Sequence, residues 1–446
     1  MIFPLEKSIF RNMERSLFTK LQAWKDSPNR CPLVLDGARQ VGKTWILRQF
    51  GEKSYKDMVY VNCDRNAFAQ SLFVDYDMNR ILTALSAYSG KKILPNETLV
   101  IFDEIQEVPA GLTALKYFCE DRPDIHVAVA GSLLGLQNHV GTGFPVGKVD
   151  RLRLYPMSFK EFLLAMGESP LADYLEEGKW NEYFVIKDKL INLLREYYFV
   201  GGMPLAVDAY SKRRDIFEVR EIQNKILMDY NDDFSKHIPS NDLPKVRAIW
   251  NSVPGQLAKE NKKFIWGYLR KGARAKDYEN AIQWLMDAGL IHKVHRVKKF
   301  DIPLKFYEDS NTFKVFLNDL GLLGALANVP AKEILAESRL LTEYKGSFTE
   351  QYVEQQIRCS TDMPLYYYTN ENSTSEIDFV LQAERVYPVE VKAEENLKAK
   401  SLAYVLKANN QLNGLRFSMA DYREETRMKN IPLYLIDWYL EKKLLS

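Results

Sequence analysis

The chain has 446 residues, of which 46% are hydrophobic and 27% charged, and its formal net charge is +2. This length predicts roughly three domains, and the composition excludes a disordered or collagen-like chain. No apolar run approaches the ~20 residues of a membrane-spanning helix, and the charged N-terminus leaves no room for a signal sequence. The four cysteines are Cys31, Cys63, Cys119 and Cys359. They lie far apart, which argues against a disulfide framework. We therefore expect a soluble, cytoplasmic protein.

The first part of the chain alternates predicted helices and strands. Apolar spacing of three and four predicts a helix over Phe10–Trp24, and a second helix is predicted from Lys43 to Phe50. Short apolar runs predict five strands, at Pro32–Leu35, Met58–Val61, Thr98–Phe102, His126–Ala130 and Leu152–Tyr155. Buried-type strands separated by helices indicate an α/β domain with a mostly parallel sheet.

The rest of the chain changes character twice. Residues 160–235 are helical in pattern, with a break at Gly201-Gly-Met-Pro204. A helix around Ala281–Asp287, a strand at Leu290–Val297 and strand-like segments near Phe306 and at Val315-Phe316 follow in the order of a winged helix. The last part is predicted to hold a helix and three strands, at Phe348–Ile357, Leu365–Tyr368, Ile377–Leu381 and Val386–Val391.

A glycine-rich segment after the first strand matches the phosphate-binding pattern G-x-x-x-x-G-K-[ST]. It comprises Gly37, Ala38, Arg39, Gln40, Val41, Gly42, Lys43 and Thr44. Its glycines let backbone N–H groups point at phosphates, and the following helix adds its positive end. Lys43 would reach the β- and γ-phosphates, and the Thr44 hydroxyl would complete a Mg²⁺ shell. The segment therefore predicts an ATP site.

Two acids follow the apolar strand Thr98–Phe102 in the manner of a Walker B motif. Asp103 would stand where parallel sheets place their ligands and hold Mg²⁺, while Glu104 would activate or orient the attacking water. At the end of the strand His126–Ala130, Ser132 is a candidate γ-phosphate sensor, and a helix N-cap is an equally good interpretation. Near the fifth strand, Lys148 and Arg151 are candidates to reach a neighbouring subunit's phosphate, which leaves a homo-oligomer open. A solvated basic turn is at least as good an interpretation of these two residues.

These motifs, with Leu154-Tyr-Pro-Met-Ser-Phe159, Gly201-Gly-Met-Pro204 and Asp232-Asp-Phe-Ser-Lys236, recur in one order. The chain thereby resembles prokaryotic AAA+-type ATP-binding proteins with a C-terminal domain of unknown function. The resemblance implies an ATPase core (1–165), a helical lid (166–240), a basic winged helix (241–330) and a restriction-endonuclease-like domain (331–446). Many members have an arginine where this chain has Lys148, which places an arginine finger there in doubt.

Basic residues are concentrated in the predicted winged helix. Residues 245–299 hold thirteen lysines and arginines against four acidic residues, a net charge of +9, so the remainder of the chain carries −7. Arg270, Lys271, Arg274 and Lys276 lead into the predicted recognition helix that contains Trp284. Such asymmetry is typical of phosphate-contacting proteins and predicts nucleic-acid binding, with duplex DNA favoured. The alternative is a solvated basic face that packs on an acidic neighbour.

The C-terminal part contains Asp378, Glu390 and Lys392 in the spacing D-x₁₁-E-x-K. A hairpin would place both carboxylates on one face, where they would share Mg²⁺ while the lysine orients water. Glu354, on the preceding helix, is a further candidate ligand, and Glu350 lies one turn earlier on the same face. The pattern resembles the PD-(D/E)xK nuclease core. An exposed strand with this spacing, or a fold kept for binding alone, is the alternative.

Together these features predict a cytoplasmic AAA+-type ATPase that uses ATP and Mg²⁺ and binds nucleic acid, with a nuclease-like domain whose cleavage activity is left open. The main alternative is a switch that holds ATP without hydrolysing it and recruits a protein partner through its C-terminal domain.

Overall fold

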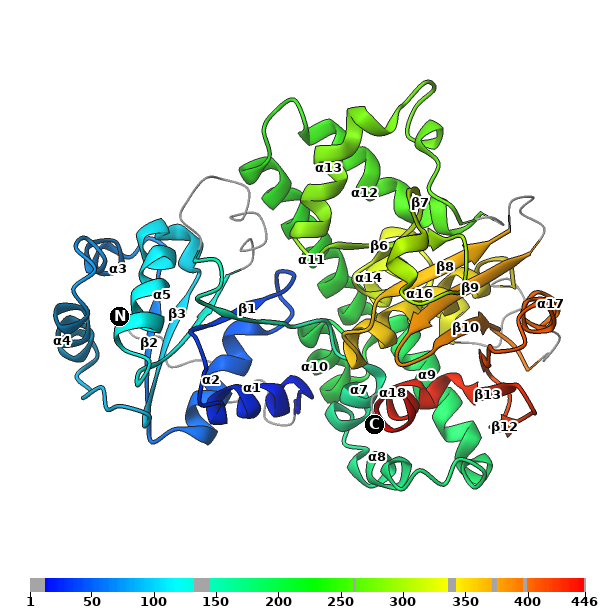
Figure 1. Ribbon diagram of the computed structural model, residues 1–446, viewed down its shortest axis with the longest axis horizontal. Coiled ribbons are helices and arrows are strands. Elements are labelled where there is room, and N and C mark those ends of the chain that lie inside the picture. The colour runs from blue at the N-terminus through cyan, green and yellow to red at the C-terminus, as the bar shows by residue number, and fades with distance from the viewer. Residues whose placement is uncertain are drawn as a thin grey trace. The chain divides into compact units, whose positions relative to one another are not determined.

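The computed structural model describes residues 13–131, 145–259, 262–335, 342–370, 375–395 and 399–444 (Figure 1). These residues form two compact units. The first unit contains residues 14–155 with 287–290, and the second contains residue 13, residues 156–286 and residues from 291 onward. No helix in the described ranges is long and apolar enough to cross a membrane.

The first unit is built on a parallel sheet, which confirms the α/β prediction. Its described strands lie in the order β2-β3-β4-β1-β5, with β1 at Leu33–Asp36, β2 at Asp57–Asn62, β3 at Thr98–Asp103, β4 at His126–Ala130 and β5 at Asp150–Arg153. Its helices are α1 (Leu17–Asp26), α2 (Lys43–Ser54), α3 (Ala67–Leu72), α4 (Met78–Ser89) and α5 (Pro109–Asp121), with a 3₁₀ turn η1 (Ile105–Glu107). β4 thus separates the P-loop strand from the strand that carries Asp103.

Helices cover both faces of this sheet. Figure 1 shows α3, α4 and α5 on one side and α1 and α2 on the other. On the α3–α5 side, Val34, Val100, Phe102 and Val129 join one apolar cluster with side chains of these helices. Because both faces are covered, the central strands β1, β3 and β4 are buried and largely apolar, with polar groups at their ends. The edge strand β5 alternates between partly buried and exposed residues.

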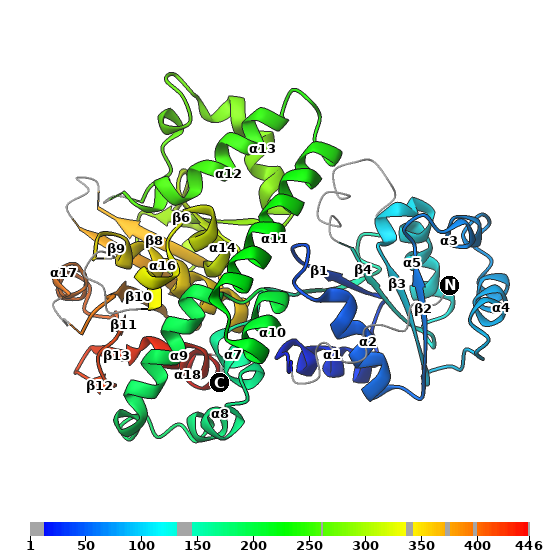
Figure 2. The ribbon, with the colours of Figure 1, turned by 180° about the vertical axis from the view of Figure 1, so that it is seen from behind.

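The second unit begins with helices and ends with a mixed α/β region. Its helices are α7 (Phe159–Ala165), α8 (Ser169–Glu176), α9 (Lys187–Val200), α10 (Pro204–Arg213), α11 (Ile216–His237), α12 (Leu243–Leu257), α13 (Ala275–Asp287), α14 (Leu320–Leu326), α15 (Ala331–Leu335), α16 (Thr342–Ser360), α17 (Lys400–Ala408) and α18 (Ile436–Lys443). Short 3₁₀ turns are η2 (Tyr183–Ile186), η3 (Trp266–Tyr268), η4 (Leu304–Tyr307) and η6 (Leu433–Leu435). Figure 2 shows these helices from behind.

The sheet of this unit runs from the predicted winged helix into the predicted C-terminal domain. Its described strands lie in the order β12-β13-β11-β10-β9-β8-β6-β7. They are β6 (Ile291–Val297), β7 (Glu308–Leu317), β8 (Leu365–Thr369), β9 (Glu376–Gln382), β10 (Val386–Val391), β11 (Gly414–Ser418), β12 (Arg423–Glu424) and β13 (Met428–Pro432). β6 and β7 are antiparallel, and β6 pairs in parallel with β8.

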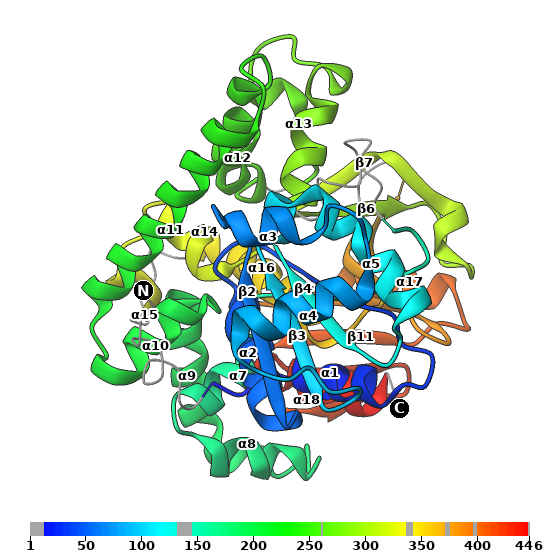
Figure 3. The same ribbon diagram turned by 90° about the vertical axis from the view of Figure 1, so that its left-hand side faces the viewer.

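The β6–β7 hairpin, yellow-green in Figure 3, therefore belongs to the C-terminal sheet. The predicted boundary at residue 330 separates β6 and β7 from the strands with which they share one hydrogen-bonded sheet. The sequence did not indicate this pairing, because β8 lies about 70 residues after β6 and local sequence does not reveal so distant a parallel partner. The strand predicted near Phe306 is wrong: Phe306 lies in η4, and β7 is one strand of ten residues. The four-domain division otherwise stays a prediction.

The Gly201-Gly-Met-Pro204 break anchors the start of the second unit. Gly202 accepts a hydrogen bond from Met157 N–H (2.7 Å) and donates its own N–H to Asp319 Oδ2 (2.6 Å). Tyr197 Oη donates to Met157 O (2.5 Å). A Cβ atom at Gly202 would overlap Met157 O, so the close approach requires glycine. The chain is thus fixed two residues after it leaves the first unit.

The expectation of unpaired cysteines is wrong for one pair. Cys31 and Cys119 form a disulfide in the first unit, with their Cα atoms 5.1 Å apart. They are 88 residues apart in sequence, so no spacing motif signals the pair. The cytoplasmic location, which rested partly on the cysteines, stays a prediction.

Candidate nucleotide site and charge clusters

The glycine-rich loop forms a tight turn between β1 and α2. Gly37 and Gly42 have φ of +146° and +97°, which favour glycine. A Cβ atom at Gly37 would also overlap the carbonyl oxygen of Leu154. Asp36 stabilises the turn, because its carboxylate accepts hydrogen bonds from Gly37 N–H and Arg153 Nη2, each 2.8 Å long.

Lys43 is buried at the start of α2. Its Nζ donates to the carbonyl oxygens of Gly37 and Ala38, each at 2.8 Å, so the ammonium group lies within the curve of the loop. Burial lowers the pKa of Lys43 to about 8, although the nearby carboxylates of Glu104, Asp36 and Asp103 oppose the shift. An anion bound in the loop would stabilise the charged form of Lys43 and so raise its pKa.

Thr44 and Asp103 meet as the two motifs predict. Thr44 Oγ1 donates to Asp103 Oδ2 at 2.7 Å, and Tyr60 Oη donates to the same oxygen at 2.8 Å. Burial raises the pKa of Asp103, and the two hydroxyl hydrogen bonds oppose this effect. A hydroxyl and a carboxylate side by side are the hard oxygen donors that Mg²⁺ prefers, so these residues fit the metal of a nucleotide complex.

Glu104 adopts the left-handed region, with φ +51° and ψ +42°. This conformation costs a non-glycine residue about 1–2 kcal/mol, and such strain often marks functional positions. Gln106 Nε2 donates to Glu104 Oε2 at 2.6 Å and holds the carboxylate. Ser132, the candidate sensor, lies outside the described residues. Lys148 pairs with Glu120 of its own unit at 2.9 Å.

Sequence motifs did not signal several residues of this site. Tyr60 comes from the middle of β2, and Asp36 and Arg153 stand beside the motifs without belonging to them. Gln106 ends the segment Phe102–Gln106 that carries part of the family resemblance, but it was not proposed as a site residue. Asp36 and Arg153 reach the site because the carboxyl ends of parallel strands meet at one edge of the sheet. Tyr60 reaches Asp103 because β2 pairs with β3. Their positions follow from the strand order, which a sequence does not state.

A P-loop before a helix, with a strand-end acid bonded to its threonine, is the arrangement of a P-loop NTPase. Three family models match the chain in succession. Residues 29–163 match an AAA domain, residues 191–333 a domain of unknown function (DUF8612), and residues 345–436 a domain of unknown function (DUF4143). Residues 29–163 are thus an AAA-type domain, and the chain is an ATPase.

Several solved structures are distantly similar. The Walker-type ATPase PABY2304 of Pyrococcus abyssi is 16% identical, with 73% of this chain and 100% of that chain covered and a TM-score of 0.45. The Aeropyrum pernix Orc1 protein in complex with DNA is 13% identical, with 74% and 97% covered and a TM-score of 0.31. A variant of Thermotoga maritima RuvB is 16% identical, with 62% and 88% covered and a TM-score of 0.29. No curated protein matches the chain.

A second group of charged residues is buried in the C-terminal sheet. Asp378 and Glu390 lie on the adjacent strands β9 and β10, and Asp378 Oδ2 accepts a hydrogen bond from Val391 N–H at 2.7 Å. Asp378 is also hydrogen-bonded to Glu350 of α16. Burial, with the charge of Glu350 beside it, raises the pKa of Asp378 well above its ordinary value. A proton on this pair is therefore favoured on Asp378 over Glu350.

Lysines already occupy the carboxylates of this cluster. Lys314 is fully buried, and its Nζ lies 2.5 Å from Glu376 Oε1 and 3.4 Å from Glu350 Oε2. Lys262 contacts Glu350 Oε1, and Lys392 Nζ lies 2.6 Å from Glu390 Oε1. Burial would raise the pKa of Glu350, but Lys314 and Lys262 hold it below its ordinary value. Lys314, Lys262 and Lys392 thus contact the carboxylates of Glu350, Glu376 and Glu390.

Of the predicted metal ligands, Asp378 and Glu390 lie close together on adjacent strands, whereas Glu354 does not join them. Glu354 lies 3.1 Å from His292 Nδ1 and 3.1 Å from Arg358 Nε, so Glu350, one turn earlier, faces Asp378 instead. One oxygen of the cluster, Glu390 Oε2, is buried without a partner. In the part of the chain that the structure describes, no three His, Cys, Asp or Glu residues are arranged to hold a metal ion. The cluster as it stands does not fit Mg²⁺.

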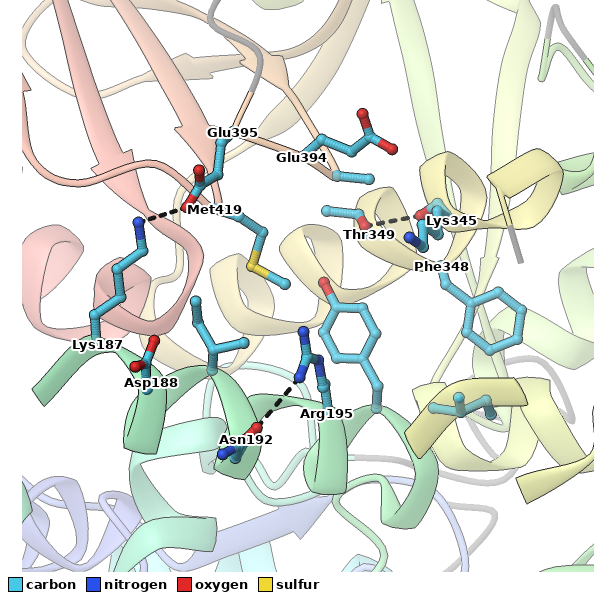
Figure 4. Close-up of a pocket in the computed structure, with 14 residues that line it drawn as sticks. Lys187, Asp188, Asn192, Arg195, Lys345, Phe348, Thr349, Glu394, Glu395 and Met419 are labelled. Atoms are coloured by element: carbon cyan, nitrogen blue, oxygen red, sulfur yellow. Dashed lines mark hydrogen bonds and ion pairs between the residues drawn. The ribbon is translucent and has the colours of Figure 1, made fainter. Parts of the chain in front are cut away.

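A pocket of about 840 Å³ lies elsewhere in the second unit, between α9, α16 and the segments that follow β10 and β11 (Figure 4). Its lining includes Lys187, Asp188, Arg195, Tyr198, Phe348, Glu394, Glu395 and Met419. Lys187 Nζ bonds Glu395 Oε1 across it at 2.6 Å. The lining mixes both charges with apolar side chains and includes neither Asp378 nor Glu390, so the predicted nuclease motif does not open into this pocket.

Proposed function

We propose that the chain hydrolyses ATP with Mg²⁺ at the P-loop and binds nucleic acid through the basic surface around α13. In the first unit, the loop from Gly37 to Thr44 would hold the phosphates. Thr44 and Asp103 would hold Mg²⁺, which offsets charge on the phosphates. Glu104 would position the attacking water, because it follows Asp103 directly at the end of β3 and Gln106 holds its carboxylate.

The observation that carries the nucleic-acid proposal is the exposure of four cations before and within the first turn of α13. Arg270, Lys271, Arg274 and Lys276 are all exposed. Within the described residues, none of the four is in an ion pair. Lys298 and Lys299 are also exposed, at the tip of the β6–β7 hairpin. These six side chains are therefore available for phosphate contacts.

Other cations of the same segment support the protein itself. Lys245 pairs with Asp242, Lys262 with Glu350 and Arg296 with Asp309. Lys293 is partly buried over the ring of Phe313. The net charge of +9 therefore overstates the surface that nucleic acid would meet, and the test should remove the exposed residues alone.

The face of α13 that would meet the ligand is polar. Tyr278, Ala281, Ile282 and Leu285 are buried, whereas Lys276, Glu279, Asn280 and Gln283 are exposed. Trp284, in the predicted recognition helix, is partly buried and packs on Phe234 with ring centroids 5.5 Å apart. Phosphate contacts would supply affinity, and the amide side chains would be the candidates for base contacts.

The test is duplex binding measured by fluorescence anisotropy at several salt concentrations. We expect log K to fall linearly with log salt, and replacing the four α13 cations by alanine should reduce the slope by about 3–4. A matched control replaces four exposed lysines elsewhere: Lys92, Lys332, Lys400 and Lys407. An equal loss in the control, or no loss in the α13 variant, would refute the proposal.

For the C-terminal sheet we favour a role in binding or structure without cleavage, because lysines occupy its carboxylates. Plasmid DNA with Mg²⁺ or Mn²⁺ should stay intact, and Mn²⁺ should find no tight site in the nucleotide-free protein by electron paramagnetic resonance. Metal-dependent cleavage that is lost in Asp378→Asn would restore the nuclease prediction.

A further inference from the structure

A buried arginine outside the nucleotide motifs donates hydrogen bonds to the P-loop and to the segment after β5. Arg15 precedes α1 and is 7% exposed. Its Nη1 donates to the carbonyl oxygen of Val41 at 3.0 Å, and its Nη2 donates to the carbonyl oxygen of Tyr155 at 2.6 Å. Val41 lies inside the P-loop, two residues before Lys43. Tyr155 is the last residue of the first unit before Pro156 begins the second.

The packing of α1 holds Arg15 in place. Leu17, Leu21 and Trp24 of α1 are buried. Phe18 and Trp24 lie against Phe50 of α2, with ring centroids 5.5 Å and 6.4 Å apart. The backbone of Arg15 is therefore fixed relative to the helix that follows the P-loop.

The P-loop needs such a partner for its carbonyl groups. Lys43 donates to the carbonyl oxygens of Gly37 and Ala38 from within the loop, whereas the Val41 carbonyl oxygen accepts from Arg15. A buried carbonyl group needs such a partner. Val41 is fully buried, so water does not serve its carbonyl group. An unsatisfied buried carbonyl group costs about 1–3 kcal/mol, and the loop would distort to avoid that cost.

The guanidinium group suits this task because its donors have a fixed geometry. One planar group bonds Val41 and Tyr155 together and sets the distance between the loop and the segment after β5. A lysine at this position would offer one compact ammonium group and would serve the two carbonyl oxygens less well. The Leu154 carbonyl oxygen against Gly37 is a second contact between the same two segments.

We propose that Arg15 is a positioning residue for nucleotide binding: it holds the P-loop at Val41 in its phosphate-binding shape and ties the loop to Tyr155. Arg15 does not need to touch the nucleotide for this effect. The proposal concerns the ATPase site and is independent of nucleic-acid binding. It predicts that loss of Arg15 weakens phosphate binding more than it slows the chemical step, because Thr44, Asp103 and Glu104 keep their places.

The test compares Arg15→Met, Arg15→Lys and the control Arg122→Met. Arg122 pairs with Asp124 at 2.8 Å in the same unit, and its replacement removes an arginine without touching the P-loop. For Arg15→Met we expect the Kd for ADP and the KM for ATP to rise about 10- to 100-fold, the range set by one or two charged hydrogen bonds. We expect kcat to change less than about threefold.

The conservative variant separates positioning from folding. Arg15→Lys should recover part of the ADP affinity, and Arg122→Met should bind ADP within about twofold of wild type. Thermal unfolding without nucleotide shows that each variant is folded at the assay temperature. If Arg15→Met does not fold, Arg15→Lys carries the test with an expected rise in Kd of about three- to tenfold. Unchanged ADP affinity in the folded Arg15 variants, or an equal loss in Arg122→Met, would overturn the proposal.

Discussion

Replacing Lys314 by methionine tests whether the C-terminal charge cluster is held together by its lysines. Methionine keeps most of the side-chain volume and removes the charge. Burial would lower the pKa of Lys314, but Glu350 and Glu376 raise it above its ordinary value. The folded protein therefore binds this proton more tightly than the unfolded chain, and the stabilisation is fully present at neutral pH and below. Loss of one partner of a buried ion pair costs about 3–5 kcal/mol.

The size of the expected loss follows from the contacts. Lys262 still contacts Glu350 after Lys314→Met. We therefore expect the free energy of unfolding to fall by about 3 kcal/mol, the lower end of the range. Lys305 is the matched control in the same hairpin: it pairs with Glu308 at 2.7 Å, but its side chain is 71% exposed. Lys305→Met should lower the free energy of unfolding by less than about 1 kcal/mol.

The assay is urea unfolding, with a double-mutant cycle between Lys314→Met and Glu350→Met. The sum of the losses of unfolding free energy in the two single variants should exceed the loss in the double variant by about 1–3 kcal/mol, because removal of both partners leaves fewer unpaired charges. A cost for Lys314→Met no larger than that of Lys305→Met would refute the ionic account of the cluster.

Three further predictions concern the nucleotide site and the start of the second unit. Glu104→Gln should slow phosphate release at least about 100-fold while the Kd for ADP stays within about threefold; unimpaired turnover would remove Glu104 from the mechanism. Because the pKa of Lys43 is lowered to about 8, ATP affinity should fall above that pH by up to ~10-fold per pH unit, and calorimetry that gives a constant Kd from about pH 7 to 9.5 would contradict this. Gly202→Ala should cost about 2–4 kcal/mol through its overlap with Met157, whereas Gly346→Ala, with open space at its Cβ, should be neutral or stabilising by thermal unfolding.

The sequence predicted the parts of the site that local chemistry dictates. A P-loop needs its glycines, lysine and hydroxyl in consecutive positions, so Gly37–Thr44 was recognisable without the fold. The contact of Thr44 with Asp103 followed from the same logic, because both stand at the carboxyl edge of a parallel sheet. The break at Gly201–Pro204 was also visible, and the structure places the end of α9 and the start of α10 there.

The sequence did not predict what depends on long-range pairing. Tyr60 and Arg15 reach the nucleotide site through strand order and helix packing. Glu350 and Glu354 share a helix face, so spacing alone did not reveal which of them faces Asp378. Lys314 comes from a hairpin that joins the C-terminal sheet through β8, and its neutralising charge was therefore absent from the sequence-based prediction of a metal site.

The most direct test of the central claim is equilibrium binding of ATP to the wild-type protein and to Lys43→Ala, with and without Mg²⁺. We predict saturable binding to the wild type that Mg²⁺ strengthens, and a loss of at least about 100-fold in Lys43→Ala, because the buried ammonium group is the cation enclosed by the loop. Equal affinity of the two proteins would contradict the assignment of the Gly37–Thr44 loop as the phosphate site.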